Sequence, residues 1–502
     1  MNTVAKQRVL IFIVAYQAEK TIVDVVCRIP AAVLEVYDFE LLIIDDSSKD
    51  KTFELSHELS QRADIPFKIH VLFNPANQGY GGNQKLGYRY AIEHGFEFVA
   101  LLHGDGQYAP ECLPCLLKPL AQDGAAAVFG SRMITPKGAR KGGMPLYKYL
   151  GNRILTKIQN LLLRTNLSEF HSGYRVYSVD ALRSIPFERN SNGFHFDTEI
   201  IIQLVVAKLP IVELPIPTYY GDEICRVNGI AYAFDVVIAT LHARLQELSL
   251  FYDSRYDCSP GLLSQYQPKL SFQSPHKFAI DLIPPNSKVM DLGCATGYVA
   301  SELKVRKNCH VTGVDMFPPL AERIDDFHCR DLNQGLAGIP IGSAEYVLLL
   351  DVIEHIASPE AFLDDLRNRL SQAELIISTG NVAFVITRLM LMMGQFNYGE
   401  RGILDMTHTR LYTFSSLSRL LEQSGFAIIE TQAIPAPFPL AVGNGRLGRG
   451  LLKLNSFLIK INAHLFGYQM VMRAKALPTV KSLLEAAHEA SSSKAQSLRR
   501  AS

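Results

Sequence analysis

The sequence of 502 residues lacks any uninterrupted apolar run long enough to cross a bilayer. The most lipid-like stretch, residues 382–393, is short and is interrupted by Arg388. Because a membrane-spanning helix needs about 20 consecutive apolar residues, none is expected. The N-terminus passes from Lys6 and Arg8 into a strand-like segment without a cleavage site, so no secretory signal peptide is expected either.

Cysteine is sparse and poorly spaced for a metal site or a disulfide framework. The chain has 8 cysteines, and Cys112 and Cys115 form the only CxxC pair. No second pair or histidine follows at the spacing of a zinc site. Reduced, structural thiols in a cytoplasmic protein are therefore expected.

Neither sign of charge predominates. The formal net charge is +1, so nucleic acid is not expected as a partner. The 48% hydrophobic and 20% charged fractions are those of a soluble globular protein. The chain is too long for one ordinary core, which predicts two or three domains.

The first half of the chain alternates between short strand-like and longer helix-like segments. The expected strands are residues 9–15, 40–44, 68–73, 98–102 and 126–130, with helices at 18–28, 50–62 and 81–94. Such alternation predicts an α/β fold, a mainly parallel sheet covered by helices. Ligands of these sheets bind at the carboxyl ends of the strands, where Asp45, Asp46 and Asp105 fall.

A polar segment punctuated by proline and glycine, residues 251–270, predicts a linker between domains at 1–250 and 271–478. Beyond it the alternation resumes, with strands expected at 288–291, 310–315, 344–350, 374–378, 427–434 and 469–474. A second Rossmann-like α/β domain is therefore expected. Residues 479–502 are rich in serine, alanine and basic residues, which predicts a flexible basic tail.

Two polar motifs mark a candidate site in the first domain. Asp45 and Asp46 end one expected strand, and Asp105 and Gln107 follow another at alternate positions. A metal held by one or two carboxylates, with positions left for phosphate oxygens, can offset the charge of a nucleotide-sugar diphosphate. Taken singly, each motif is equally consistent with a strand-end turn or a helix cap.

Together these motifs belong to a longer ordered series, residues 14–19, 43–48, 77–83, 105–111, 130–132, 172–175 and 196–199. The series resembles the family 2 glycosyltransferases of the GT-A fold. Among them it is most similar to the branch of dolichyl-phosphate mannose synthases and bacterial polyprenyl-phosphate glucosyltransferases.

The resemblance implies inverting transfer of a sugar from a nucleotide-sugar to a polyprenyl-phosphate or glycan acceptor, which requires no protein nucleophile. The nucleotide-sugar would be bound by Ala15, Glu19, Asp45, Asp46 and Arg132. Mg²⁺ or Mn²⁺ would be held by Asp105, Gln107 and His103. The catalytic residues would include Asp105, Glu169 as a candidate base, and Arg175, which with Arg132 would face phosphates.

One departure from the family concerns His103, which stands where this branch has the first carboxylate of an Asp-x-Asp motif. A neutral imidazole can bind a metal but brings no charge. A glycosyltransferase domain that only binds glycan or nucleotide-sugar therefore remains an alternative.

The second domain contains a glycine-containing loop after its first expected strand. Gly293 and Gly297 allow close backbone approach to a ligand, and Asp315 ends the next strand, where it could hold ribose hydroxyls. A dinucleotide-binding loop would carry three glycines in the pattern GxGxxG, and only two are present here.

Residues 291–297, 313–315, 330–332 and 350–356 give residues 270–477 a resemblance to class I S-adenosylmethionine-dependent methyltransferases. The resemblance implies that S-adenosylmethionine is bound by Asp291, Gly293, Gly297, Asp315, Asp331 and Asp351. His355 lies where related O-methyltransferases deprotonate an acceptor hydroxyl, with a structural histidine as the alternative. Residues 381–414 resemble the variable segment that covers the acceptor.

The sequence therefore predicts a bifunctional enzyme of cell-surface glycan or glycolipid biosynthesis. It would combine glycosyl transfer with S-adenosylmethionine-dependent methylation, and the position of His355 favours oxygen as the methylated atom. The alternative is a methyltransferase with a binding module. A cytoplasmic location is expected, with peripheral contact at the inner membrane face left open; no oligomeric state is predicted.

Overall fold

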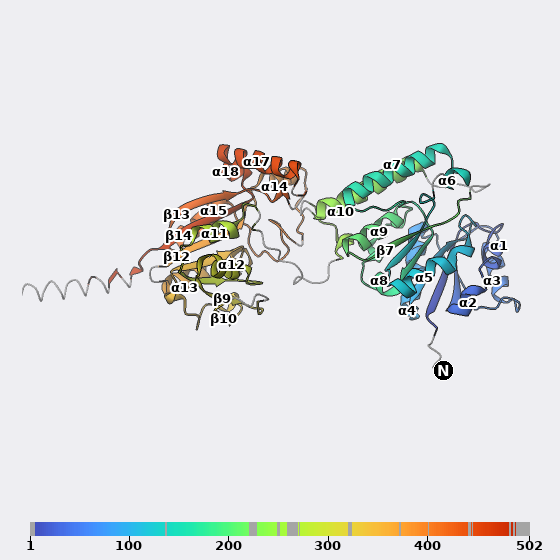
Figure 1. The fold of residues 1–502 in the computed structure, drawn as a ribbon, viewed down its shortest axis with the longest axis horizontal. Helices are drawn as coiled ribbons and strands as arrows, with labels where there is room; N and C mark the ends of the chain where they lie inside the picture. The colour runs from blue at the N-terminus through green and yellow to red at the C-terminus, as the bar shows by residue number, and fades with distance from the viewer. Residues whose placement is uncertain are drawn as a thin grey trace, which may run out of the picture. The chain divides into compact units, whose positions relative to one another are not determined.

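The computed structural model describes residues 6–135, 138–219, 228–247, 251–258, 270, 272–319, 324–370, 373–399, 401–439, 443, 445–480, 483–484 and 487. The chain divides into two compact units, Met1–Glu247 with Tyr252–Leu262, and Leu248–Phe251 with Leu263–Ser502 (Figure 1). Two α/β units are thus present, as the alternation of segments predicts. Most of the expected tail, 479–502, lies outside the described residues.

The first unit is built on a seven-stranded sheet of order β3-β2-β1-β4-β6-β5-β7. Its strands are β1 (Arg8–Ala15), β2 (Asp38–Asp45), β3 (Ile69–Phe73), β4 (Phe98–His103), β5 (Ala127–Ser131), β6 (Arg175–Ser178) and β7 (Ile211–Pro215). Strands β1 to β4 are parallel, whereas β6 runs antiparallel between β4 and β5. The sheet is therefore mixed, and the carboxyl ends of β1, β2 and β4 share one edge.

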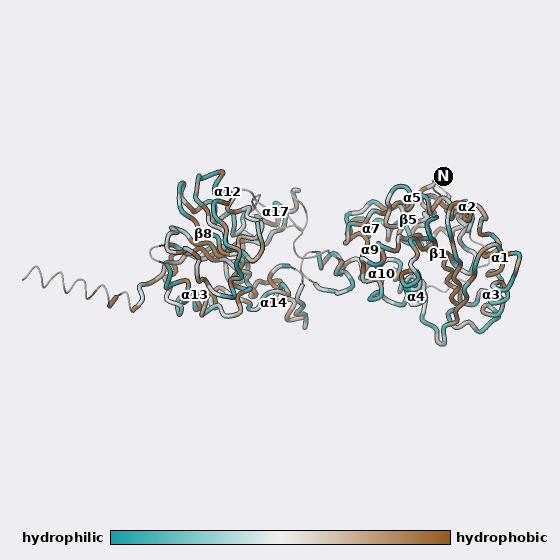
Figure 2. Tube along the Cα trace, turned by 90° about the horizontal axis from the view of Figure 1, so that it is seen from below, coloured by the Kyte–Doolittle hydropathy of each residue, from teal (hydrophilic) through white to brown (hydrophobic). Residues whose placement is uncertain are grey.

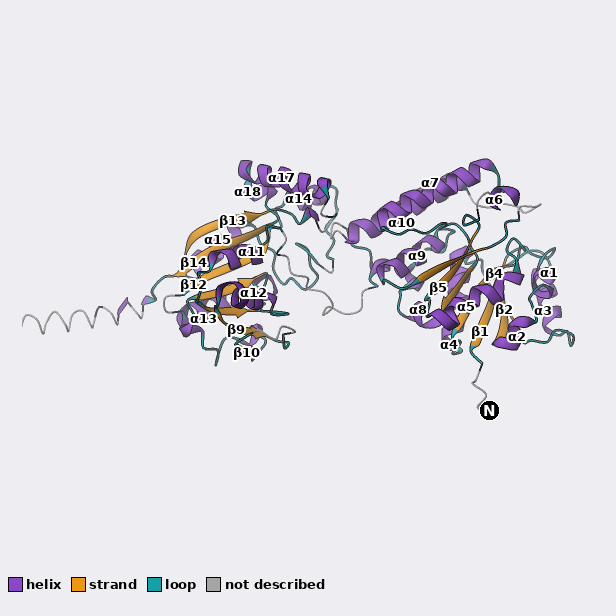
Figure 3. Ribbon diagram, viewed as in Figure 1, coloured by secondary structure: helices purple, strands orange, loops and turns teal. Residues whose placement is uncertain are grey.

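Helices cover both faces of this sheet (Figure 3). They are α1 (Ile22–Cys27), α2 (Ala32–Val36), α3 (Thr52–Ser60), α4 (Gly79–Glu93), α5 (Leu113–Asp123), α6 (Gly138–Lys141), α7 (Leu146–Leu163), α8 (Val179–Arg183), α9 (Phe196–Val206) and α10 (Gly229–Glu247). Alternate residues of β1 enter opposite cores, as the period of a strand requires: Ile11 packs with α1 and α5, and Phe12 packs with α4 and α9.

Residues 252–258, predicted as the start of the linker, pack onto the first unit instead. The Tyr256 ring is buried in a small cluster with Ile202 and Ala239. Arg255 forms an ion pair with Glu199 of α9. The polar composition of this segment gave no sign of the buried Tyr256 ring or of the ion pair between Arg255 and Glu199. The predicted linker, residues 251–270, therefore begins too early.

The second unit holds another seven-stranded sheet, of order β10-β9-β8-β11-β12-β14-β13. Its strands are β8 (Lys288–Leu292), β9 (His310–Asp315), β10 (Asp326–Cys329), β11 (Tyr346–Leu350), β12 (Glu374–Gly380), β13 (Phe426–Ile434) and β14 (Gln469–Ala476). β14 is antiparallel to both of its neighbours, and the pairs among β8 to β12 are parallel. In Figure 2 the strands of each sheet form the hydrophobic centre of their unit.

The helices of the second unit are α11 (Pro275–Leu282), α12 (Tyr298–Lys307), α13 (Pro359–Arg369), α14 (Val385–Met392), α15 (Phe414–Gln423), α17 (Arg446–Ile461) and α18 (Ala463–Phe466). α11 and α12 pack on one sheet face, and α13 and α15 on the other. The expected lipid-like stretch forms α14, and no helix among the described residues is long and apolar enough to cross a membrane. Cys112 and Cys115 are free thiols.

Candidate active sites

The loops after β1, β2 and β4 meet at the carboxyl edge of the first sheet. The Thr21 hydroxyl donates a hydrogen bond to the Gly104 carbonyl (2.6 Å), and the Gln17 amide donates to the Ser48 hydroxyl (2.8 Å). These bonds tie the loop after β1 to the two other loops. Residues predicted from separate motifs therefore gather on one rim: Ala15, Glu19, Asp45, Asp46 and Asp105.

Asp46 organises this rim through its own carboxylate. One oxygen accepts hydrogen bonds from the Asn74 side chain (2.7 Å) and the Gln78 amide (2.8 Å). The other accepts from the Gly79 amide (3.0 Å) at the start of α4. Asp46 therefore holds the loop that leads into α4, and this use of its oxygens favours a role in shaping the nucleotide site.

Asp45 is fully buried, yet one of its carboxylate oxygens lacks a partner within the described part of the chain. The other accepts a hydrogen bond from the Ser48 amide (3.0 Å). Burial raises the pKa of Asp45, and the nearby Asp50 and Asp46 raise it further, against the lowering effect of Ser48. A buried carboxylate oxygen without a donor is suited to accept a hydrogen bond from a ligand.

His103 ends β4 and is fixed on several sides. Its Nε2 lies 3.1 Å from the Tyr80 hydroxyl, which itself donates to Asp197 (2.9 Å). Because that hydroxyl has one proton, Nε2 is the donor to Tyr80 and Nδ1 keeps its lone pair. The Tyr108 ring packs edge-on against the imidazole at 4.9 Å, and a Cβ at Gly173 would lie 2.6 Å from it. Burial lowers the pKa of His103 despite the neighbouring Asp105 and Asp197, which favours the neutral ring.

A neutral histidine whose second nitrogen donates to a fixed partner is the arrangement found at metal ligands. Asp105 is exposed, and it accepts a hydrogen bond from the Gln107 amide (3.0 Å). Within the described ranges, no group of three or more His, Cys, Asp or Glu side chains could by itself hold a metal. His103, Asp105 and Gln107 lie at alternate positions at the end of β4 and in the loop that follows it.

Glu169 and Arg132 form a buried ion pair. Arg132 donates to the Glu169 carboxylate from Nε (3.0 Å), from a terminal guanidinium nitrogen and from its backbone amide (2.7 Å), and the Asn152 side chain donates as well (2.8 Å). Burial raises the pKa of Glu169, but the charge and hydrogen bonds of Arg132 outweigh it and leave the pKa below its ordinary value. This geometry favours a positioning role for Glu169 over the base predicted from the sequence.

Arg175 is buried inside the fold. The sequence had instead predicted that its side chain would face a phosphate. Its side chain donates to the carbonyls of Ser172 (2.8 Å), Asp197 (2.7 Å) and Phe170 (2.9 Å), and it is 1% exposed. All three guanidinium nitrogens thus brace the segment before β6 and the start of α9. The correction follows from β6, which inserts Arg175 between two other strands of the sheet.

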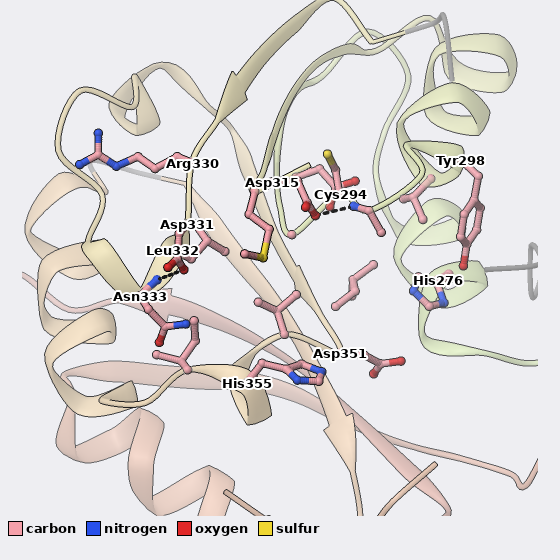
Figure 4. A pocket seen from close by; sticks show the side chains of 18 residues that line it. His276, Cys294, Tyr298, Asp315, Arg330, Asp331, Leu332, Asn333, Asp351 and His355 are labelled. Atoms are coloured by element: carbon pink, nitrogen blue, oxygen red, sulfur yellow. Dashed lines mark hydrogen bonds between the residues drawn. The ribbon is translucent and has the colours of Figure 1, made fainter. Parts of the chain in front are cut away.

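The second candidate site is a pocket of about 240 Å³ at the carboxyl edge of the second sheet (Figure 4). Its lining includes five of the residues predicted to bind S-adenosylmethionine: Asp291, Gly293, Asp315, Asp331 and Asp351. Gly297 is not in the lining; it precedes α12 with a φ of 77° and donates from its amide to the Cys294 carbonyl (2.8 Å). His276, Tyr298 and Asn333 also line the pocket and were missed by motif analysis.

The loop after β8 has a backbone that only certain residues tolerate. Gly293 has a φ of 79°, and a Cβ there would lie 2.4 Å from the Val352 side chain. Ala295 donates from its amide to one Asp315 oxygen (2.8 Å), and Phe317 donates to the other (3.0 Å). The two loops that bound the pocket are thereby held together by one carboxylate.

Asp291 and Asp351 both line the pocket, but the surroundings of their carboxyl groups differ. Burial, together with the nearby Asp315, raises the pKa of Asp291 to about 7. Asp351 accepts hydrogen bonds from the Ser378 hydroxyl (2.7 Å) and the Gln469 side chain (2.8 Å). The Asp291 carboxyl therefore holds its proton more readily than an exposed aspartate does, and the Asp351 carboxylate is held by its two hydrogen-bond donors.

His355 lies in the short 3₁₀ segment Ile353–His355 after β11, at the rim of the pocket (Figure 4). Its Nδ1 lies 3.2 Å from the Thr407 carbonyl, which can only accept a hydrogen bond, and 3.2 Å from the Thr407 hydroxyl, which donates its own proton to Asp405 (2.7 Å). The ring proton is thus assigned to Nδ1, and Nε2 keeps a lone pair. The His408 ring packs edge-on at 4.8 Å. Thr407 and His408 belong to the segment predicted to cover the acceptor, and they fix the orientation of the imidazole.

Comparison with known families assigns each unit to a class of transferases. Residues 10–185 match the family described as glycosyl transferase family 2, and residues 263–431 match a methyltransferase domain. The resemblance of the sequence motifs to glycosyltransferases of family 2 and to methyltransferases is thereby confirmed for these two segments.

Characterised relatives are similar to the first unit. The UDP-N-acetylglucosamine–dolichyl-phosphate N-acetylglucosaminyltransferase of Methanococcus voltae is 28% identical over 252 residues, which cover 48% of this chain and 98% of that protein. The undecaprenyl-phosphate mannosyltransferase of Micrococcus luteus is 29% identical over 210 residues, 42% of this chain and 82% of that one. The solved glucosyl-3-phosphoglycerate synthase of M. tuberculosis aligns with a TM-score of 0.35 at 18% identity, covering 47% of this chain and 80% of that one.

Proposed function

Because the chain joins a family 2 glycosyltransferase domain to a methyltransferase domain, we propose that it catalyses two reactions in glycan or glycolipid assembly. The first domain transfers a sugar, with inversion, from a nucleotide-sugar to a polyprenyl phosphate or a glycan. The second methylates a hydroxyl group with S-adenosylmethionine. The acceptors named for the Methanococcus and Micrococcus relatives, dolichyl phosphate and undecaprenyl phosphate, support this acceptor class.

The rim that unites His103, Asp105 and Asp45 supports the glycosyl transfer. A divalent metal bound there, Mg²⁺ or Mn²⁺, would stabilise the charge of the departing diphosphate. His103 presents Nδ1 and Asp105 presents its exposed carboxylate, while Asp45 offers one free oxygen to the nucleotide. A phosphate acceptor is already ionised, so this transfer needs no strong base, and Glu169 serves to hold Arg132.

The pocket formed by Gly293, Asp315 and His355 supports methyl transfer. S-adenosylmethionine supplies the methyl group as an electrophile. Asp315 fixes the loop that approaches this cofactor, and Nε2 of His355 is oriented to accept the proton of an acceptor hydroxyl. These roles support O-methylation, carried out by a cytoplasmic enzyme that meets lipid-linked acceptors at the membrane face.

A thermal-shift experiment on the full chain tests both sites. UDP, GDP and their sugars are added with Mn²⁺, and S-adenosylhomocysteine is added separately, because a ligand that binds only the folded state raises the melting temperature. Stabilisation by one nucleotide class and by S-adenosylhomocysteine is expected. Absence of any response to S-adenosylhomocysteine would refute the methyltransferase assignment, and absence of a metal-dependent nucleotide response would refute the glycosyltransferase assignment.

One observation favours a second candidate, a methyltransferase whose first domain binds nucleotide-sugar or glycan without turnover. His103 replaces a carboxylate, and within the described ranges no cluster of three ionisable ligands surrounds it. Metal-dependent consumption of a nucleotide-sugar that is lost in Asp105→Ala would exclude this candidate. Binding without consumption, in the presence of a broad acceptor panel, would establish it.

A further inference from the structure

The outward side of α17 separates apolar from basic side chains along its length. Its exposed apolar residues, 54–65% accessible, are Leu447, Leu454, Phe457 and Ile461. Its exposed basic residues are Arg446, Arg449, Lys453 and Lys460. Positions seven apart lie on nearly the same side of a helix, so 447, 454 and 461 form one stripe and 446, 453 and 460 form another. The helix contains no aspartate or glutamate.

The rotation of α17 is fixed by a polar residue on its inner side. Asn455 is buried; it accepts a hydrogen bond from the Ala436 amide (2.9 Å) and donates to the Phe466 carbonyl (3.0 Å). Gly448, two turns earlier, is buried on the same side. Rotation of α17 about its axis would break both hydrogen bonds of Asn455. The fold itself therefore keeps the apolar stripe exposed.

A groove of about 480 Å³ runs between α17 and the segment that leads into α11. Three lysines and three apolar side chains belong to its lining, Lys277, Lys453, Lys460, Phe272, Leu452 and Phe457. Lys277 is paired with Asp281 (2.8 Å), whereas Lys453 and Lys460 have no hydrogen bond or ion pair with any described residue. The groove thus offers two uncompensated ammonium groups beside phenyl rings.

This combination points to an anionic partner with an apolar interior. A second copy of α17 is disfavoured, because a two-fold interface would bring the basic stripes of both copies together. A purely solvated face does not account for four large exposed apolar side chains. An interfacial helix, by contrast, buries an apolar face at the acyl boundary and places lysines at the lipid phosphates.

We propose that α17 and its lysine groove dock the methyltransferase domain onto an anionic phospholipid surface. α17 lies in the connection between β13 and β14, and β14 begins with Gln469, which donates to Asp351 at the pocket rim. A membrane contact at α17 is therefore only a short stretch of chain from the methyl-transfer site. The inference goes beyond the proposed function and rests on this surface, so its test does not require turnover.

The absence of tryptophan from the chain provides a direct test. Phe457→Trp introduces a single tryptophan among the exposed apolar residues of α17, and Ile429→Trp introduces one at an exposed position of β13 (49% accessible) as the matched control. Each full-length variant is mixed with vesicles of phosphatidylcholine and phosphatidylglycerol, with plain or brominated acyl chains. Brominated chains should quench the fluorescence of Phe457→Trp and leave Ile429→Trp unchanged. An unquenched tryptophan at 457 would overturn the proposal.

The second part of the experiment tests the contribution of the lysine charges to vesicle binding. Each lysine close to an anionic surface contributes roughly fivefold to partitioning, so Lys453→Gln with Lys460→Gln, in the Phe457→Trp protein, should require about 25-fold more lipid for half-maximal quenching. Vesicles of phosphatidylcholine alone should show a similar loss. Equal binding in both cases would overturn the proposal. So would a lipid-independent spectral shift that grows with protein concentration, which would assign the face to a second copy. Turnover of water-soluble acceptors, measured on the same variants, reports separately on the proposed function.

Discussion

His103 and His355 occupy comparable places in the two domains, yet their rings are turned to opposite uses. His103 ends β4, which pairs with β1, and His355 lies shortly after β11, which pairs with β8. His103 directs Nε2 to Tyr80, whereas His355 directs Nδ1 to the Thr407 carbonyl. The comparison shows that the partner of one ring nitrogen decides which nitrogen keeps a lone pair, and thus what the imidazole can bind.

The acidic residues of the two sites also differ in their surroundings. Asp46 accepts hydrogen bonds from the side chain of Asn74 and from the backbone of the loop before α4, so its charge is used within the protein. Asp291 is buried beside Asp315, and its pKa is raised to about 7. The first rim is built around a carboxylate whose oxygens are occupied by donors of the protein, and the second holds one whose pKa is raised to about 7.

The sharpest separation of the two sites comes from Asp105→Ala. Loss of the exposed carboxylate beside His103 should lower sugar transfer by about 1,000-fold, because the charge of the leaving diphosphate is then less well compensated. Methyl transfer to a preformed acceptor should be unchanged. The assay follows labelled sugar in the lipid extract. Asp123→Ala, an exposed aspartate at the end of α5, is the control; equal activity of the two variants would break the assignment of the first site.

His355→Ala should produce the converse result. Loss of a positioned general base should lower methyl transfer by about 100- to 10,000-fold, while the affinity for S-adenosylhomocysteine and sugar transfer remain at their original values. Methyl transfer is measured with labelled S-adenosylmethionine across a pH series. His310→Ala, at the exposed start of β9, is the matched control. A parallel loss of S-adenosylhomocysteine binding would instead indicate a structural histidine.

Tyr80→Phe tests the orientation of His103. Removing the hydroxyl leaves Nε2 without its partner and leaves the Asp197 carboxylate with Gln84 as its hydrogen-bond donor, so the metal should bind about 10- to 100-fold more weakly. Sugar transfer should recover at high Mn²⁺, which a purely structural defect would not allow. Tyr147→Phe, in the exposed ring of α7, is the control. An unchanged Mn²⁺ titration would show that Tyr80 does not set the tautomer.

Asp291→Asn should produce the smallest change, one of pH dependence. The carboxyl loses its proton near pH 4 when unfolded and near pH 7 when folded, so the folded state binds the additional proton between these values. The stability contributed by this group should therefore fall as pH rises from about 4 to about 7. The melting temperature of the second domain, followed from pH 5 to 7.5, should decline less steeply in Asp291→Asn. An identical slope in the two proteins would contradict the raised pKa.

Local sequence patterns predicted the limits of the strands that carry the sites. They did not predict how those strands pair with one another. β9 matches its predicted limits, and β1 begins one residue earlier, because runs of buried β-branched residues end at clear polar turns. β6, β7 and β10 were not predicted. The position of Arg175 depends on β6 entering the sheet between β4 and β5, which is a non-local pairing that no short segment reveals.

The candidate residues were found by type, and the structure supplied their partners. Arg132 and Glu169 were both identified, but their pairing across 37 positions of sequence changes the role that Glu169 is suited to play. Tyr80 lies within the motif at residues 77–83. Membership of that motif was the one sequence signal that pointed to Tyr80, and its contact with His103 came from the structure. Tautomers and paired charges are set by neighbours distant in sequence, and these are what the sequence could not provide.

The most direct test of the central claim is mass spectrometry of the lipid product made by the full chain. Nucleotide-sugar, polyprenyl phosphate, Mn²⁺ and S-adenosylmethionine with a deuterated methyl group are supplied together. The wild type should yield one product that carries both sugar and labelled methyl group, and His355→Ala should stop at the unmethylated sugar. A methylated product without sugar, formed equally by the wild type and Asp105→Ala, would contradict a two-reaction enzyme.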